Sequence, residues 1–270
     1  MITGTSGAAE RLRERLAADG LDWIVPGWAA PEGVVALSTT RNGGVSTGAC
    51  ASMDLGPARV RDAADRAAIL ANRALFAGYA PAAPVYLAQV HGTRVVTIGP
   101  DDLAACAADP PEADAAVTRD RGVVLAVRTA DCLPVVFADR DATVVGIAHA
   151  GWRGLAAGVL EAALAAMHVD AARVVAWVGP GIGPGAFEVG RDVVDAFVTR
   201  ASEDADCFAP REDGKWMADL PVLAQRRLLR AGVRDVAGGA WCTHADERRF
   251  HSWRRDQSAG RMATAVWIEP

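Results

Sequence analysis

The chain has 270 residues, of which 51% are hydrophobic and 23% charged, and its net charge is −5 at neutral pH. This composition is that of an ordinary globular protein with a sizeable core. The negative charge argues against a general binder of nucleic acid or of membrane surfaces. Residues 1–10 lack an apolar signal-type stretch, no run approaches the length of a membrane span, and the five scattered cysteines form no disulfide framework. We therefore expect a reduced, cytoplasmic protein.

The predicted elements follow one another without a regular βαβ alternation. A helix over residues 8–18 ends at Asp19-Gly20, so we divide the chain into a loosely attached leader helix, residues 1–20, and one domain, residues 21–270. Further helices are predicted at 62–79, 154–167, 189–200 and 220–232, and strands at 34–40, 85–90, 94–98, 115–118, 123–128, 135–138, 143–148, 174–178, 250–255 and 263–268. Residues 101–112 and 201–216 are predicted to be irregular. This order favours an α+β fold over a doubly wound sheet.

The stretch 129–153 is predicted to be the centre of the molecule. Two β-branched runs flank the polar turn 139–142, which indicates a β-hairpin. Pairing across a symmetric turn sets residue 138 opposite 143 and, further out, Cys132 opposite His149. Directly opposed residues have Cβ atoms about 4.5–5.5 Å apart, so the thiol and the imidazole could share a metal or a proton. Asp131 stands beside them at the loop, where functional groups concentrate.

A metal site needs a third ligand, and His91 is the best candidate because it ends a strand and precedes a permissive glycine. Three protein ligands with an open fourth position is the layout of a catalytic zinc. The spacing matches no compact zinc motif, and a buried structural cysteine is the alternative reading. His168 is interpreted as structural or solvated, and His244 and His251 as structural or supporting residues of the same pocket.

Other residues are candidates for substrate contact. Arg41 and Arg153 follow strand-like runs at loop mouths, and two arginines near a zinc pocket would suit an anionic co-substrate such as phosphate. Gln89 shares a strand end with His91, and Trp152 could stack on a planar base or simply pack. The Gly/Pro run 179–185 has either a phosphate-cradle or a packing role.

Six segments carry a resemblance to a known family. They are STTRNGGVS at 38–46, QVHG at 89–92, TADCLP at 129–134, HAGWRG at 149–154, GPGIGP at 179–184 and CTH at 242–244. These motifs resemble the YfiH family, also called the laccase-domain or polyphenol-oxidase family. They recur together and in order, and the resemblance extends from about residue 24 to the C-terminus.

The resemblance implies an α+β sandwich in which mixed β-sheets pack with helices, distantly like a cysteine-hydrolase toxin domain, with residues 21–270 as the catalytic domain. It implies a zinc ion (Zn²⁺) bound by His91, Cys132 and His149. It also implies purine nucleoside phosphorylase and adenosine deaminase activities. For bacterial members, it further implies a role in editing incorrect peptidoglycan precursors.

The expected function is therefore zinc-dependent phosphorolysis of adenosine- or inosine-type nucleosides to free base and ribose 1-phosphate, together with deamination of adenosine. Asp131 could move the proton in deamination, and purine nucleosides and phosphate would be the partners of a chain expected to be monomeric. One alternative is a metal-free cysteine hydrolase, with Cys132 as nucleophile and His149 as base. Another is a factor that binds or edits cell-wall precursors.

Some positions depart from the family pattern. Asp54 stands where the family often has Asn, Gly181 and Gly185 where it often has Cys, and Phe187 and Trp253 where it often has Tyr. The change at Asp54 bears on substrate preference more than on metal binding. A multicopper laccase is disfavoured because the chain has five histidines and no His-x-His motif, so copper is less expected than zinc.

Overall fold

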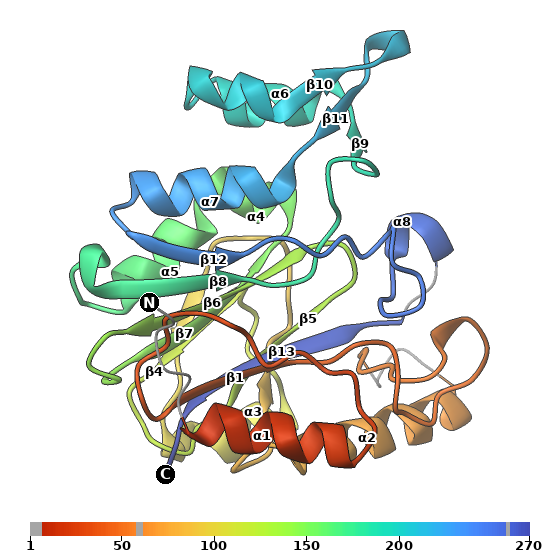
Figure 1. Cartoon of the computed structure of the whole chain (residues 1–270), viewed down its shortest axis with the longest axis vertical. Coiled ribbons are helices and arrows are strands. Elements are labelled where there is room, and N and C mark those ends of the chain that lie inside the picture. Colours follow the sequence, from red (N-terminus) through yellow and green to blue (C-terminus); the bar gives the residue numbers. More distant parts are fainter. Residues whose placement is uncertain (1–6, 58–61, 258–259) are drawn as a thin grey trace.

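Two β-sheets face each other at the centre of the molecule (Figure 1). A computed structural model describes residues 7–57, 62–257 and 260–270. The larger sheet has the order β12-β8-β6-β7-β4-β3 and the smaller one β1-β13-β5-β2. In the larger sheet the bounds are β3 Val95–Thr97, β4 Ala115–Thr118, β6 Leu133–Asp139, β7 Val145–Ala150, β8 Val174–Val178 and β12 Asp235–Gly238. In the smaller they are β1 Val34–Ser38, β2 Val85–Tyr86, β5 Leu125–Thr129 and β13 Met262–Ile268.

Helices cover the outer face of each sheet, so both faces of the central strands are buried. Along β6, Val135 and Phe137 face the helices, whereas Val136 and Ala138 face the other sheet. This alternation explains why the central strands appear in the sequence as continuous apolar runs. The helices of the larger sheet are α4 Trp152–Ala157, α5 Val159–Ala166 and α7 Leu220–Arg230, and those near the smaller sheet are α1 Gly7–Ala18, α2 Ala63–Ala77 and α3 Leu103–Ala108.

The N-terminal helix α1 packs on the smaller sheet. Leu12 and Leu16 are buried in one apolar cluster with Leu37 and Trp267. The guanidinium of Arg13 also donates a hydrogen bond to the carbonyl oxygen of Pro26 at 2.9 Å. The helix is thus part of the outer layer of the sandwich.

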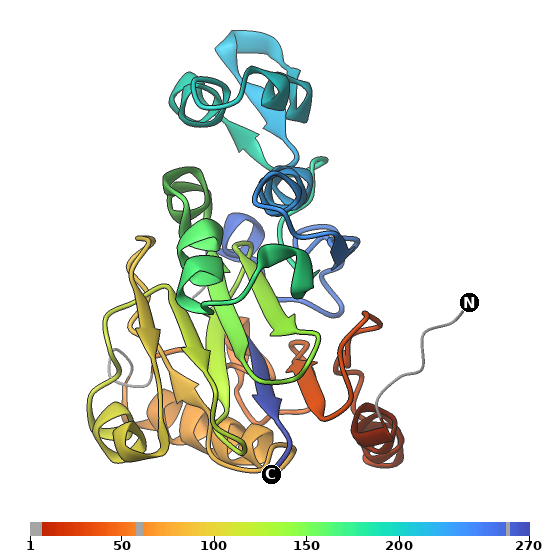
Figure 2. The same cartoon turned by 90° about the vertical axis from the view of Figure 1, so that its left-hand side faces the viewer.

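A small three-stranded sheet, of order β10-β11-β9, stands apart from the sandwich. Together with α6 it forms the top of the molecule in both views (Figures 1 and 2). Its elements are β9 Glu188–Val189, α6 Arg191–Val198, β10 Phe208–Pro210 and β11 Trp216–Ala218. The prediction that 201–216 lacks regular structure is therefore wrong for β10. It is also wrong for the segment before β10, which is a 3₁₀ helix, Ser202–Cys207.

The central hairpin is confirmed, but its predicted register is wrong. Ala138 pairs with Val145 rather than with residue 143, so His149 lies opposite Pro134 instead of Cys132. The cause is the carboxylate of Asp139, which accepts hydrogen bonds from the backbone nitrogens of residues 143 and 144 at 2.7 and 2.8 Å. These bonds keep Asp139 in the strand and move the turn one residue along the chain.

Three other local predictions are corrected. The predicted strand 250–255 is wrong, because Ser252 caps a short helix, α8 Trp253–Asp256. The predicted loop 101–112 contains α3. The predicted helix 154–167 is two helices, because Gly158 has a left-handed φ of 109° between them.

The expected fold class is confirmed as an α+β sandwich of mixed sheets in a single domain. Parallel pairing of β2 with β5, β3 with β4 and β12 with β8 is combined with antiparallel pairing elsewhere. None of the helices in the described residues is long and apolar enough to cross a membrane.

The role of Asp139 in setting the hairpin turn can be tested by Asp139→Ala. We expect the free energy of unfolding to fall by about 1–3 kcal/mol, because several backbone donors lose their acceptor. Denaturant unfolding measures the change. Asp141→Ala is the matched control, since its side chain is 62% exposed, and it should change stability by less than about 0.5 kcal/mol. Equal losses in the two variants would contradict this role.

Candidate metal centre and its cavity

Three potential metal donors converge at the ends of neighbouring strands. His91 follows β2 in the chain, Cys132 immediately precedes β6, and His149 belongs to β7. One ligand atom from each lies within 4.8 Å of the others, and Cys132 Sγ is 3.8 Å from His91 Nε2. Across the described residues, this is the one such group of His, Cys, Asp and Glu side chains.

The donor set fits a single metal ion. A thiolate and two imidazoles suit zinc, and three protein ligands leave one position open for substrate or water. Because the described residues contain one such group, a cluster of several copper ions does not fit. The geometry therefore supports a site for one metal ion.

Two glycines lie against the donors and the loop of His91, where a residue with a side chain would not fit. A Cβ atom on Gly151 would lie 2.7 Å from His91 Cδ2 and 3.0 Å from Cys132 Sγ. A Cβ on Gly154 would lie 2.8 Å from the carbonyl oxygen of Gly92. The contacts at 2.7 and 2.8 Å are shorter than real Cβ contacts, so a side chain at position 151 would displace the ring of His91, and one at position 154 would displace the loop that carries it.

Asp114 holds two of the three donors and was missed in the sequence. The carboxylate is fully buried, and its Oδ1 lies 2.8 Å from His149 Nδ1 and accepts from the backbone nitrogen of His91 at 2.9 Å. Its Oδ2 accepts from the nitrogen of Gly92 at 2.6 Å. A carboxylate on one ring nitrogen of a histidine directs the other nitrogen toward a metal. The sequence did contain a signal for this residue, because Asp114 is a charged residue that immediately precedes the apolar strand β4.

The backbone around the donors adopts uncommon conformations. His91 has a φ of 63° and Asp131 a φ of 84°, both in the left-handed region that residues with a side chain rarely adopt. At His91 the hydrogen bonds to Asp114 hold this conformation. Such strain concentrates at functional sites when the surroundings enforce it.

Electrostatics favour a thiolate beside a protonated imidazole. Burial alone would raise the pKa of the Cys132 thiol, but the charges and hydrogen bonds of His149 and His91 together lower it to about 6. Burial alone would lower the pKa of His149, but Cys132 and Asp114 raise it to about 9. Burial alone would raise the pKa of Asp114, but the hydrogen bond and charge of His149 and the backbone hydrogen bonds of Gly92 and His91 lower it.

The donors open into a cavity of about 430 Å³. This volume lies within the range of small-molecule sites. The cavity is lined by Pro57, Gln89, His91, Arg128, Thr129, Ala130, Asp131, Cys132, His149, Ile182, Phe187, Trp253, Arg254 and Arg261. The metal donors therefore share one space with three arginines and two aromatic side chains.

Asp131 and Gln89 line this cavity, and the side chains of both form hydrogen bonds to other parts of the chain. Asp131 Oδ1 accepts from Thr243 Oγ1 at 2.6 Å and its Oδ2 from the backbone nitrogen of Arg254 at 2.7 Å. The amide of Gln89 donates to the carbonyl oxygen of Arg128 at 2.8 Å and accepts from its nitrogen at 2.9 Å. Both side chains thus tie neighbouring segments together.

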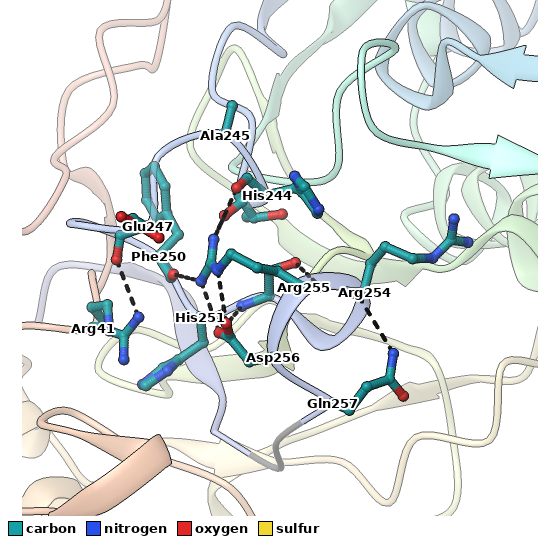
Figure 3. Close-up of polar contacts among 12 residues, drawn as sticks. Arg41, His244, Ala245, Glu247, Phe250, His251, Arg254, Arg255, Asp256 and Gln257 are labelled. Atoms are coloured by element: carbon teal, nitrogen blue, oxygen red, sulfur yellow. Dashed lines mark hydrogen bonds and ion pairs between the residues drawn. The ribbon is translucent and has the colours of Figure 1, made fainter.

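The structure does not bring Arg41, Trp152 and Arg153 to the cavity. Arg41 donates from Nε to the carbonyl oxygen of Ala51 at 3.0 Å and from Nη1 to that of Glu247 at 3.1 Å (Figure 3). Trp152 packs against the core beside α5, and the guanidinium carbon of Arg153 lies 4.4 Å from the centroid of its ring. The arginines at the cavity are instead Arg128, Arg254 and Arg261.

The Gly/Pro run 179–185 packs rather than cradling an anion. The backbone nitrogens of Gly179, Gly181 and Ile182 donate to carbonyl oxygens of Pro134, Trp241 and Asp131, respectively. The nitrogen of Gly183 donates to Cys242 Sγ at 3.2 Å. These donors already have acceptors in the protein, and Ile182 supplies an apolar part of the cavity wall.

Comparisons with known proteins agree on one family. A family model described as "Multi-copper polyphenol oxidoreductase laccase" matches residues 35–269. "Purine nucleoside phosphorylase PA4543" of Pseudomonas aeruginosa is 44% identical over 248 residues, which cover 92% of this chain and 98% of that protein. "Purine nucleoside phosphorylase YfiH" of Escherichia coli is 43% identical over 245 residues, which cover 91% and 98% of the two chains.

Solved structures show the same fold. Neisseria meningitidis protein NMB0706 superposes with a TM-score of 0.85 at 44% identity, covering 92% of this chain and 100% of that one. A Bacillus licheniformis protein titled YfiH superposes with a TM-score of 0.80 at 27% identity, covering 87% and 93%.

The chemical state of Cys132 can be read by alkylation followed by mass spectrometry. We expect slow alkylation in protein loaded with zinc and fast alkylation after chelation, because the metal would hold the sulfur and the released thiol is largely thiolate at neutral pH. Cys50 and Cys242, both half-buried, are internal controls whose labelling should not change. Rapid labelling of Cys132 in untreated, fully active protein would overturn the metal-ligand role.

Asp114→Asn tests the support of the donors. Zinc affinity, measured by competition with a chromophoric chelator, should weaken about 10- to 100-fold. The reason is that one of the two accepting oxygens is replaced by an amide NH₂ group, which cannot accept a hydrogen bond. Asp139→Asn is the matched control, since Asp139 is also buried and accepts backbone hydrogen bonds but lies in the hairpin turn. If both variants bind zinc as the unchanged protein does, Asp114 does not support the site.

Proposed function

Because this chain belongs to the YfiH family, which the matching model describes as multi-copper polyphenol oxidoreductase laccase, we propose that it catalyses phosphorolysis of purine nucleosides to free base and ribose 1-phosphate. The observation that carries the proposal is the cavity, whose lining includes Arg128, Arg254 and Arg261 together with the three metal donors. Relatives that cover nearly the whole chain and are named purine nucleoside phosphorylase support the choice of substrate.

The arginines supply the phosphate subsite in this proposal. A guanidinium recognises phosphate through paired N–H donors at fixed geometry. Arg254 is held by a hydrogen bond from Nη1 to the carbonyl oxygen of Glu188 at 2.9 Å, and Arg261 by one from Nη1 to Gly260 at 2.9 Å. Arg128 is held by its bond to the carbonyl oxygen of Leu87 at 2.8 Å. These anchors keep the three positive charges at the cavity wall.

In the proposed metal site, His91, Cys132 and His149 hold one zinc ion. When bound, such an ion supplies Lewis-acid polarisation of a substrate oxygen. Asp114 fixes the ring of His149 and the loop of His91, and so keeps both imidazoles oriented toward the thiol.

The reaction itself is a displacement at the ribose. A phosphate oxygen forms a bond to C1′ while the bond from C1′ to the purine nitrogen breaks, and the base leaves with that electron pair. The contribution of the chain is to hold phosphate and nucleoside together in one small cavity, which replaces a bimolecular encounter by a positioned one.

One observation favours a second candidate, a metal-free cysteine hydrolase. In space, the thiol of Cys132 interacts with the ring of His149, and the other side of that ring contacts the carboxylate of Asp114 at 2.8 Å. Thiol, imidazole and carboxylate are arranged in this way in cysteine hydrolases. Such an enzyme would act without phosphate and without metal. Adenosine deamination, which the sequence resemblance implies, would likewise need no phosphate.

A nucleoside panel assayed with and without phosphate tests the proposal. We expect adenosine or inosine to yield base and ribose 1-phosphate only when phosphate is present, and chelation to abolish the turnover. Arg254→Ala should raise the KM for phosphate about tenfold or more and leave the zinc content intact, because one charge-assisted contact is lost. Arg153→Ala is the matched control and should leave the KM for phosphate unchanged.

The other outcomes of the panel are separable. Conversion of adenosine to inosine without phosphate would show deamination. Phosphate-independent turnover that survives chelation would favour the hydrolase. Failure to convert any nucleoside by zinc-loaded protein, with retained binding of a peptidoglycan precursor, would favour the binding factor.

A further inference from the structure

We propose that α8 forms the nucleobase wall of the cavity and that the ring of Trp253 stacks on the purine. The inference rests on the proposed function, because it assigns a part of the cavity to the nucleoside substrate. The sequence had suggested Trp152 for this contact, but that residue lies outside the cavity and packs against the core.

The exposure of Trp253 is the first observation. Its side chain is 46% exposed and lines the cavity that contains the metal donors, whereas Trp177 and Trp267 are buried in the core. A large aromatic surface left accessible inside a concave site is available for a flat, apolar ligand face. Purine bases stack on such rings whatever their substituents.

The charge around the ring is the second observation. The guanidinium carbon of Arg261 lies 5.4 Å from the centroid of the Trp253 ring, and that of Arg254 lies 5.4 Å from the centroid of Phe187. Each aromatic ring at the cavity therefore has an arginine beside it. Under the proposed function, this brings a stacking surface next to groups that bind phosphate, as a substrate pair of base and oxyanion requires.

The rigidity of α8 is the third observation. A helix of four residues is too short to be stable by itself. It is fixed at its start by the Ser252 hydroxyl, which accepts from the nitrogen of Arg255 at 3.2 Å, and by Asp131, which accepts from the nitrogen of Arg254. A ring on a fixed backbone loses little conformational freedom when a ligand stacks on it.

Arg255 completes this anchorage (Figure 3). Its guanidinium pairs with Asp256 at 2.7 Å and donates to the carbonyl oxygens of Thr243, His244 and Phe250 at 2.8–2.9 Å. The side chain thus ties the helix to the preceding loop. Because Asp131 adjoins Cys132 in the chain, the same network sets the position of Trp253 relative to the thiol.

The test compares Trp253→Phe and Trp253→Ala in the zinc-loaded full chain. Adenosine and inosine are titrated at equilibrium without phosphate, by calorimetry, and steady-state KM values are measured for nucleoside and for phosphate separately. Trp253→Ala should weaken nucleoside binding and raise its KM about tenfold or more, with the KM for phosphate unchanged. Trp253→Phe keeps an aromatic face and should stay within about threefold of the unchanged protein.

Trp216→Phe is the control, because Trp216 lies in β11 of the small sheet, outside the residues that line the cavity. Tryptophan fluorescence adds a direct signal. Adenosine should quench the emission of the unchanged protein and of Trp216→Phe, and this quenching should be lost in Trp253→Phe. Quenching that persists in Trp253→Phe, or unchanged nucleoside affinity in Trp253→Ala, would overturn the inference.

Failure of this inference and failure of the proposed function give different results. A protein that binds nucleosides through Trp253 but does not convert them with phosphate would refute the phosphorylase activity and keep the base wall. A protein that converts nucleosides equally well with alanine at position 253 would keep the activity and refute the base wall.

Discussion

The buried carboxylate of Asp114 is the constraint on which the candidate site depends. It contacts the ring of His149 and the backbone of the loop that carries His91, so two donors from different segments have one common support. A buried charge is costly unless donors surround it, and here a ring nitrogen and backbone N–H groups do so. The polar contacts that satisfy Asp114 are the same contacts that orient the donors, so fold stability and site geometry depend on one group.

The cavity around this centre is assembled from segments that lie far apart in the chain. Asp131 joins the loop of Cys132 to Thr243 and to α8, and Gln89 joins the loop of His91 to β5. Asp54 makes a similar connection, because its Oδ1 accepts from the nitrogens of Gly56 and Arg261 at 2.8 and 2.9 Å. Both bonds need only an oxygen acceptor at this position. The side chains of aspartate and of asparagine, which the family pattern often has here, can both provide one.

The description of the family as multi-copper oxidoreductases and the chemistry of this chain point in different directions. Several coppers would require several groups of imidazole ligands, and the described residues offer a single group of three donors. Relatives that cover nearly the whole chain are instead named purine nucleoside phosphorylase. The site, rather than the fold, decides between the two readings.

The sequence indicated the hairpin, the apolar strands and three converging donors, because those features depend on local patterns and on motifs. The register was wrong because the side chain of Asp139, which a polar-turn pattern treats as loop, stays in the strand. Asp114 was missed because its partners are 22 to 35 positions away.

The cavity arginines were harder still to recognise. Arg254 reaches the site only because α8 is bonded to Asp131, 123 positions earlier. Arg41 and Arg153 had the expected strand-end pattern, but their side chains turn to carbonyl oxygens and to a neighbouring ring. A pattern shows where a strand ends and not which way a side chain leaves it, so tertiary pairing had to be known first.

The wide separation of the donors has a consequence for folding. His91 lies 41 positions before Cys132, and His149 follows Cys132 in another strand, so these three donors come together only in the folded chain. Bringing the ends of such loops together costs conformational entropy. Folding of the sheets has already brought the donors together, so metal binding to the folded chain does not incur this cost again. An ion that binds only the native state stabilises it in proportion to the logarithm of its free concentration, by about 2.7 kcal/mol at 100 times its Kd. Metal supply would therefore govern how much of this protein stays folded under stress, in addition to whether it is active.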